Sequence, residues 1–309
     1  MKILISIILI SSDLFGGRQF GFNPQTTSPN SQAAPANRNL LSRHYRDAEA
    51  LAYRMKGTNN GYRGTIQYEA QANGVVKKNS AGMFIEQFGW ANLSFNNNAI
   101  PLSQRDANFR QSLSLDTDYK LSVPDLSQVT PMLIGPITDL LAFYADLQLA
   151  IRQEGLKHAG DHVYVKYGAA SSWADGVNTV IGEDSIDFDI TLAEVNANDK
   201  TASLVIRHVS PEKPQIKTPA EWMRTPVSDT PNNWIEVQKN KDGKYAAEIG
   251  KETFDVRMRI SLVDGKILSA VMDNPVEALR RECGDAALTN CSDPVRYQIR
   301  RQIELRLES

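Results

Sequence analysis

The sequence predicts a mainly β (α+β) protein: a curved antiparallel sheet or open β-barrel built of hairpins, with a central amphipathic helix and a short C-terminal helix. Two observations support this fold class. The dipeptide Phe-Asp opens two runs of alternating apolar and polar residues, at 188–189 and 254–255, and each run is followed by a turn and a second run. Residues 136–154 instead space their apolar side chains as a helix does.

The N-terminal residues indicate export. Lys2 precedes an apolar stretch, residues 3–10, that is interrupted only by Ser6. A positive start before a short apolar run is typical of a secretory signal, and the run is too short to span a bilayer easily. We expect residues 1–16 to be a signal-like segment, which would be the only contact with a membrane if it stays uncleaved.

The chain after this segment is predicted to contain one folded unit. Residues 17–41 are rich in Asn, Gln, Ser, Pro and Ala, and predict a disordered tether. Residues 42–309 are then expected to form a single antiparallel β-rich domain, located in the periplasm or outside the cell.

Composition and motifs exclude several functions. The chain carries 34 Lys and Arg against 36 Asp and Glu, a net charge of −2, so no nucleic-acid partner and no polybasic membrane surface are expected. It contains no GxSxG, P-loop or HExxH motif. His158 and His162 have helical ligand spacing, but Gly160 and the strand-like residues that follow argue against a helix. We therefore predict no catalytic residue, cofactor or metal.

The first part of the domain is predicted to begin with a short helix that runs into a strand over 42–57. Residues 64–71 alternate, Asn73-Gly74 predict a turn, and 82–95 supply bulky strand-forming residues.

The central helix is predicted from Pro136, which suits a first helical turn, to the residue before Gly155. Phe143 and Ala142 widen its apolar arc. The apolar stripe at i, i+3, i+4 and i+7 consists of Ile137, Leu140, Leu141, Tyr144, Leu147 and Ile151.

Each Phe-Asp run predicts a β-hairpin with one apolar and one polar face. Residues 196–199 make the first turn, and Asp264-Gly265 predict a two-residue second turn. The period of two places Asp189 and Asp255 on the polar face, where cross-strand Arg or Lys are the expected partners. The alternative is that this face lines a cavity in which these acids meet Asp187. The apolar positions are Ile186, Phe188, Ile190 and Leu192 in the first copy, and Phe254, Val256, Met258, Ile260 and Leu262 in the second.

Between the hairpins, residues 210–234 contain five prolines and predict a long structured loop. Trp222 and Trp234 lie in it. Such side chains either fix a loop to the sheet or stack on a sugar or an apolar ligand.

The C-terminal region combines three predictions. Asn274, Pro275 and Glu277 have the N-cap, N1 and N3 pattern of a helix, predicted over 275–283. Cys283 and Cys291 predict a disulfide, with two buried free thiols as the alternative. Residues 295–309 alternate as a long final strand.

Arg301 is the exception among the apolar positions of that strand. It either pairs with an inward-facing acid or contacts an anionic head group.

Residues 254–301 and 218–234 resemble a group of uncharacterised exported bacterial proteins, and the resemblance extends over most of 45–305. Hairpins wrapped around a helix are also similar to the half-barrel of lipoprotein carriers. That second resemblance implies that acyl chains are held between sheet and helix.

We expect an exported, non-enzymatic binding protein for a lipid or another apolar ligand. The alternatives are a secreted hydrolase with paired carboxylates, or an envelope assembly or structural factor without a small ligand. The predicted ligand-binding residues are Leu140, Phe143, Tyr144, Leu147, Trp222, Trp234 and Arg301.

Overall fold

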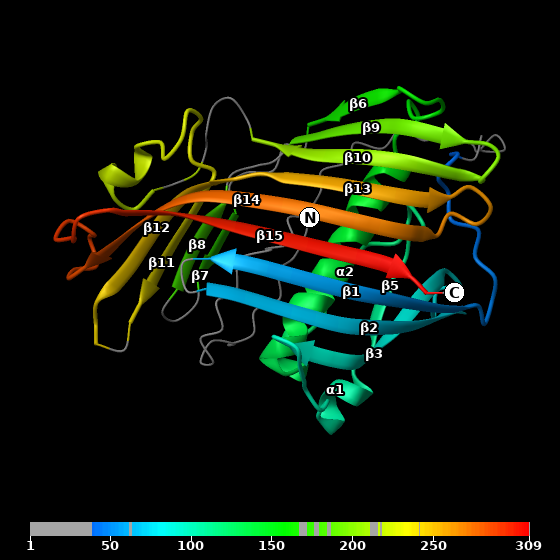
Figure 1. The fold of residues 1–309 in the computed structure, drawn as a ribbon, viewed down its shortest axis with the longest axis horizontal. Helices are drawn as coiled ribbons and strands as arrows, with labels where there is room; N and C mark the ends of the chain where they lie inside the picture. The colour runs from blue at the N-terminus through cyan, green and yellow to red at the C-terminus, as the bar shows by residue number, and fades with distance from the viewer. Residues whose placement is uncertain are drawn as a thin grey trace.

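The computed structural model describes residues 39–61, 64–166, 172–175, 179–183, 187–210, 216, 218–240 and 242–308. Nearly all of the signal-like segment and the tether, and Ile186 of the first repeat, lie outside this part of the chain. The described chain confirms a mainly β protein, with one open antiparallel sheet (Figure 1).

Fifteen strands belong to this sheet. In chain order they are β1 Ala50–Gly61, β2 Gly64–Lys78, β3 Phe84–Phe95, β4 Asn98–Ala99, β5 Gln111–Leu113, β6 His162–Val165, β7 Ser172–Asp175, β8 Thr179–Glu183, β9 Asp187–Asn196, β10 Thr201–Val209, β11 Trp234–Lys239, β12 Tyr245–Glu252, β13 Phe254–Ser261, β14 Ile267–Cys283 and β15 Val295–Leu307. The helical elements are α1 Gln104–Asn108, α2 Pro131–Ile151 and the 3-10 turns η1 Leu126–Gln128 and η2 Glu221–Arg224.

The sheet forks at β14. One path runs β4-β3-β2-β1-β15-β14-β12-β11-β8-β7, while β13, β10, β9 and β6 form a branch from the first half of β14 (Figure 1). We call this branch the long wing, and β12, β11, β8 and β7 the short wing. On one side, β14 pairs with β13 up to Asp273 and with β12 from Val276. On its other side, β14 pairs with β15 along both of these segments. Pro275 lies at the fork, where its missing N–H removes no regular ladder bond.

The predicted C-terminal helix over 275–283 is wrong, because these residues are the second half of β14. Their side chains alternate in burial, with Val276 and Ala278 inside and Glu277 outside. β12 and β15 pair with the segment on both sides. This pairing satisfies the backbone groups of the segment, so long-range contacts override the local capping pattern.

Two predictions in the first part of the domain are also wrong. Residues 42–49 have no helix, and β1 begins at Ala50. Asn73 and Gly74 lie inside β2, and the chain turns only after Lys78. A Cβ on Gly74 would approach the Phe88 ring of β3 to 2.4 Å. The Phe88 ring therefore packs over Gly74, which is a strand residue and not a turn residue.

The predicted central helix is α2, but it begins at Pro131, five residues earlier than expected, and ends at Ile151. Pro131 occupies the N-terminal position, and Pro136 lies inside the helix. The helix is long and apolar enough to cross a membrane by composition. Most of it is buried within the described fold, so it is a core helix here.

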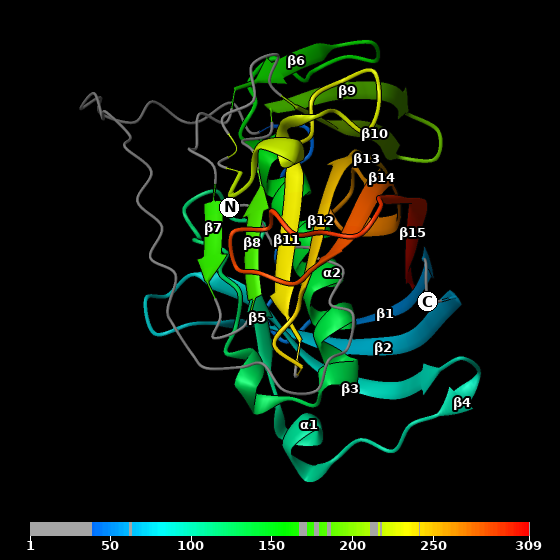
Figure 2. The same ribbon diagram turned by 90° about the vertical axis from the view of Figure 1, so that its left-hand side faces the viewer.

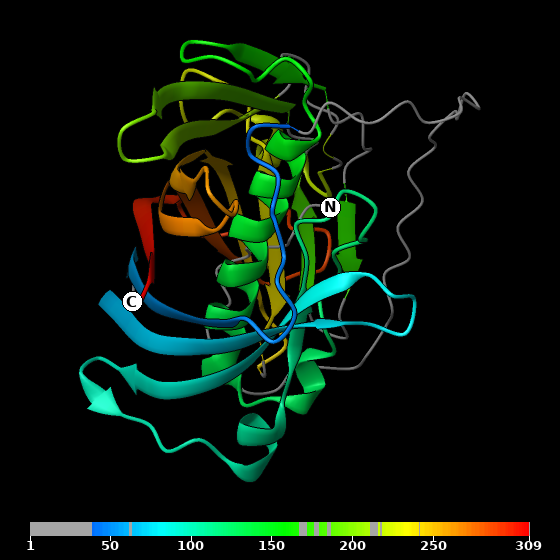
Figure 3. The same cartoon turned by 90° about the vertical axis from the view of Figure 1, so that its right-hand side faces the viewer.

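The expected amphipathic character of α2 is wrong, because the helix is buried nearly all round. The side away from the sheet is covered by two segments. One is the N-terminal strap, residues 39–49, which runs beside the helix in Figure 3. The other lies before α2 in the chain and includes residues 114–119. The Asn39 amide donates to the carbonyls of Ile151 and Gln153. The Gln148 amide donates to the carbonyls of Ser114, Asp116 and Tyr119.

Both repeated hairpins are present, as β9–β10 and β13–β14. β10 pairs with β13, so the two copies lie side by side in the long wing. The second turn spans residues 262–266 and is longer than the predicted two-residue turn. Gly265 has a φ of 72°, and a Cβ there would approach the Ser42 carbonyl oxygen to 2.3 Å. The turn therefore needs glycine, both for its backbone conformation and for contact with the N-terminal strap.

The main core lies between α2 and the sheet, with side chains from β1, β2, β3, β9, β10, β13, β14 and β15. Two smaller clusters lie where β11 and β12 of the short wing meet the second half of β14, β15 and residues 220–227. Figure 2 shows α2 with β1, β2 and β3 below the strands of the long wing. The final strand is confirmed as β15.

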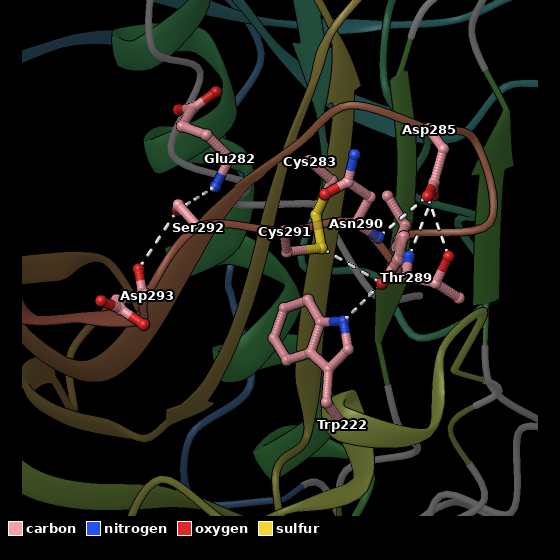
Figure 4. Close-up of a disulfide and its surroundings, with 10 residues drawn as sticks. Trp222, Glu282, Cys283, Asp285, Thr289, Asn290, Cys291, Ser292 and Asp293 are labelled. Atoms are coloured by element: carbon pink, nitrogen blue, oxygen red, sulfur yellow. Dashed lines mark hydrogen bonds between the residues drawn. A yellow bond between two sulfur atoms is a disulfide. The ribbon is translucent and has the colours of Figure 1, made fainter.

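The disulfide between Cys283 and Cys291 is also confirmed, with an S–S distance of 2.05 Å. Figure 4 shows it closing the turn between β14 and β15.

Candidate functional site

Three buried carboxylates lie at the interface of α2 with the sheet. Glu86 comes from β3, and Asp139 and Asp146 come from α2. The two helix acids are seven residues apart, which is close to two turns and places both on one face. Acids are almost never fully buried unless they are paired. Their partners therefore describe how the helix is fixed to the sheet.

Asp139 is bound by two donors from the sheet. Tyr68 of β2 donates to Oδ2, and Arg301 of β15 forms an ion pair with Oδ1. Burial raises the pKa of Asp139, and Arg301 opposes that shift. Burial also raises the pKa of Tyr68 well above its usual value. The structure thus pairs Arg301 with an inward-facing acid, the first of its two predicted roles.

Tyr68 reaches Asp139 because Gly57 leaves room on the neighbouring strand. The two residues face each other in the register of β1 and β2. A Cβ on Gly57 would approach Cε1 of the Tyr68 ring to 2.1 Å. Glycine at this position allows the ring to lie across β1 towards the helix.

Glu86 connects α2 with the N-terminal strap. Tyr144 of α2 donates to its Oε2, and the Arg43 Nε donates to its Oε1 at 2.8 Å. Burial raises the pKa of Glu86, and Arg43 opposes that shift. Both carboxylate oxygens are engaged, so the arrangement positions Tyr144 and Arg43.

Arg43 also belongs to a chain of ion pairs along the strap. Its Nη2 lies 2.6 Å from Glu49, and Lys266 Nζ lies 2.6 Å from Glu49 and 3.0 Å from Asp264. Although burial opposes the shift, hydrogen bonds from Lys266 and Arg43 lower the pKa of Glu49. The strap is therefore tied to β3 and to the β13–β14 turn by charge.

Asp146 contacts the long wing. Its Oδ1 lies 3.3 Å from Nε2 of His208, while its buried Oδ2 has no hydrogen-bond partner within the described chain. His208 lies between Phe188 and Phe254 on the adjacent strands, with ring centroids 4.7 Å away on each side. The three rings form a row across β9, β10 and β13.

The predicted ligand-binding residues divide into two groups. Leu140, Phe143, Tyr144 and Leu147 are fully buried in the main core, and Arg301 contacts the same helix through Asp139. Trp234 lies on β11 of the short wing, and Trp222 lies on η2.

Trp222 donates its indole N–H to the Leu288 carbonyl beside the disulfide (Figure 4), and its ring lies 5.1 Å from the Arg281 guanidinium carbon. Trp234 is buried with Val276, Ala278 and Ile299. Trp222 contacts β14 and the turn after it, Trp234 packs on β14 and β15, and the structure does not bring either side chain to α2.

The acids of the repeated phrase lie on the polar side of the long wing. Asp189 and Asp255 flank Arg207 in the register of β9, β10 and β13. Arg207 pairs with Asp255 at 3.3 Å, and Asp189 pairs with His162 at 2.5 Å. The expected cross-strand partner of Asp255 is confirmed.

Asp187 receives a hydrogen bond from Tyr164 at 2.9 Å, at an exposed position. His158 and His162 contact different acids, Asp161 and Asp189. Within the described ranges, no group of three or more His, Cys, Asp or Glu side chains could hold a metal ion.

The sequence patterns did not indicate Arg43, Glu86, Asp139, Asp146 or His208 as site residues. One pattern could have revealed two of them, because Asp139 and Asp146 interrupt the apolar helix at a spacing that keeps them on one face. Arg301, the charged residue at an inward position of the final strand, indicates an anionic partner, and an inward-facing acid is one of its two predicted partners. The identity of that acid depends on tertiary structure.

The geometry defines an open antiparallel sheet with one buried helix, fixed to it by polar contacts that include those of Asp139, Tyr144 and Asp146. No known protein family matches the sequence, and no curated protein is found to be similar to it.

Proposed function

We propose that this protein is an exported, non-enzymatic binding protein for an apolar ligand, such as the acyl chain of a lipid. The supporting observation is the interface between α2 and the sheet, where Leu140, Phe143, Tyr144 and Leu147 are fully buried. These side chains fill the interface in this structure. A ligand would therefore replace them after α2 moves, with the sheet curved around it as a half-barrel.

The internal hydrogen bonding of α2 supports such a movement, while its bonds to the strap, to residues 114–119 and to the sheet oppose it. An α-helix forms its backbone hydrogen bonds internally, so it can leave a sheet without breaking the strand ladder. Irregular segments, 114–125 and 152–161, flank it along the chain. The apolar contacts that are lost would be replaced by the ligand, and the ligand need only favour the open state over the closed one.

Export is supported by the disulfide. Bonds of this kind form and persist in oxidising compartments such as the bacterial periplasm and the extracellular space. The Cys283–Cys291 bond therefore agrees with the secretory pattern of residues 1–16.

Two measurements test the proposal. The protein would be purified natively from the exported fraction, and its extract analysed by mass spectrometry, where we expect molecules with acyl chains at a fixed ratio to protein. The purified protein would then be titrated with the neutral fluorescent probe N-phenyl-1-naphthylamine. No co-purified acyl chain and no saturable probe binding would refute the proposal and favour an assembly or structural role.

A matched control separates the interface from surface adsorption. Val75 and Val271 are exposed valines on β2 and β14. The double variant Val75→Ser, Val271→Ser should bind the probe as the unchanged protein does. Loss of binding in this variant would place the probe on the outer surface and contradict the proposed site.

A further inference from the structure

Arg301 and Tyr68 converge on one carboxylate from opposite sides of β1. In the register of the sheet, Arg301 faces Asn59 of β1 and Tyr68 faces Gly57. Each donates to a different oxygen of Asp139. The sheet thus holds two hydrogen-bond donors, one of them positively charged, arranged around a single carboxylate.

Arg301 depends on α2 for its counter-charge. Its side chain is only 11% exposed, and its acid partner in the described chain, Asp139, belongs to the helix. Movement of α2 would take Asp139 away and leave the guanidinium between its cross-strand neighbours Asn59 and Asn274, neither of which carries a charge. An uncompensated buried charge is strongly unfavourable, so the open state requires a replacement anion or water.

Arg43, in contrast to Arg301, does not depend on α2 for its counter-charge. Its acid partners are Glu49 and Glu86, and it also donates to the His44 and Asp264 carbonyls. These groups lie on the strap, β3 and the β13–β14 turn, and none lies on α2. Displacement of the helix would leave Arg43 neutralised.

We propose that the ligand is an anionic amphiphile, whose carboxylate or phosphate head binds Arg301 and Tyr68 in the place that Asp139 occupies here. This inference rests on the proposed function and specifies the chemical class of the ligand. Asp139 acts as an internal substitute for the head group in the closed state. The head group supplies the lost counter-charge, and the chain replaces the apolar side chains of α2.

The test uses the full chain and competition with N-phenyl-1-naphthylamine at pH 8. The competitors are oleate, oleyl alcohol and acetate. Oleate has both the charged head and the chain, oleyl alcohol has the chain without the charge, and acetate has the charge without the chain. We expect oleate to displace the probe at about tenfold lower concentration than oleyl alcohol, as one charge-assisted contact would give. Acetate alone should not displace it.

Variants assign this preference to Arg301. The double substitution Arg301→Met, Asp139→Leu replaces the buried pair with apolar side chains of similar volume, a change that folded proteins tolerate. It should bind oleate and oleyl alcohol equally. The matched control is Arg300→Met, Asp273→Leu, which removes the exposed pair of the adjacent residue at 2.9 Å and should keep the preference.

A third variant, Asp139→Asn, removes the internal competitor. It should bind oleate about tenfold more tightly than the unchanged protein, since Arg301 no longer has a carboxylate partner.

The outcomes separate this inference from the proposed function. Equal displacement by oleate and oleyl alcohol in the unchanged protein would overturn the anionic ligand class and leave apolar binding intact. Displacement by neither would refute apolar binding itself. Displacement by acetate as strong as by oleate would show a site for small anions and overturn the amphiphile.

Discussion

Arg43 and Glu86 form a buried ion pair at 2.8 Å that joins the N-terminal strap to β3 directly beside Tyr144 of α2. The strap thus covers the helix and is fixed by charge to β3. Removing one partner of such a pair leaves the other charged and without compensation.

The substitution Arg43→Met should therefore lower the free energy of unfolding by about 3–5 kcal/mol. Urea unfolding, followed by circular dichroism, measures this. The matched control is Arg54→Met, which breaks the exposed Arg54–Glu69 pair of β1 and β2 and should leave stability close to that of the unchanged protein. Equal effects of the two substitutions would show that the strap is not fixed by Arg43.

Glu49 should stabilise the fold in a pH-dependent manner. Its pKa is lowered from 4.5 by Lys266 and Arg43, although burial opposes the shift. An acid with a lowered pKa contributes stability above its ordinary value, and that contribution is lost as the pH falls through the folded-state value. Glu49→Gln should thus cost about 1.5–3 kcal/mol at pH 7, and the difference from the unchanged protein should shrink below pH 4.5.

Urea titrations of both proteins at pH 7, 5.5, 4.5 and 3.5 measure this difference. A constant difference across that range would mean that the charge of Glu49 is not the cause.

Gly57 is predicted to be required for the position of Tyr68. In Gly57→Ala the new methyl group would overlap the Tyr68 ring, so the ring must move away from Asp139. Overpacking of this kind costs about 1–3 kcal/mol. Gly61→Ala on the same strand is the control, because its Cβ would have no neighbour closer than 3.7 Å. Thermal unfolding should show a lower midpoint for the first variant only, and equal midpoints would contradict the close packing.

Removal of the disulfide should loosen the turn between β14 and β15. The bond closes a loop with a sequence separation of 8, and Cys283→Ala, Cys291→Ala should lower stability by about 2–3 kcal/mol by loop-closure entropy. The Trp222 indole, bonded to Leu288 in this loop, should become more exposed to acrylamide quenching. Adding Trp222→Phe to the variant without the disulfide shows how much of the fluorescence comes from Trp222. Unchanged stability and quenching would show that the loop is held by Trp222 and its neighbours without the bond.

Residue patterns predicted most of the β architecture because alternation is a local property. Phe254, Val256 and Met258 alternate with charged residues whichever strands lie beside them, so the hairpin could be recognised without its neighbours. The Cys pair and the long final strand were also within reach of the sequence. The same local reasoning failed at Asn274 and Pro275, where a helix-capping pattern lies in a strand paired on both sides.

The candidate site was only partly predictable, because its contacts join residues far apart in the chain. The Arg301–Asp139 pair spans 162 residues, and the Tyr144–Glu86 contact spans 58. The charge of Arg301 at an inward position indicated that a partner exists. Its choice of Asp139 depends on how α2 crosses the sheet.

The sequence by itself determined the mainly β class, the two hairpins and a long apolar helix, and it favoured the disulfide, since each is indicated by residues within a short segment. Tertiary structure decided that β14 is one strand shared by two wings, that α2 is covered on both sides, and which acids meet Arg43, Arg301 and His208. The physical reason is that an unpaired charge or backbone group is energetically costly when it is buried. Each such group therefore pairs with a partner that the complete fold places within hydrogen-bonding distance.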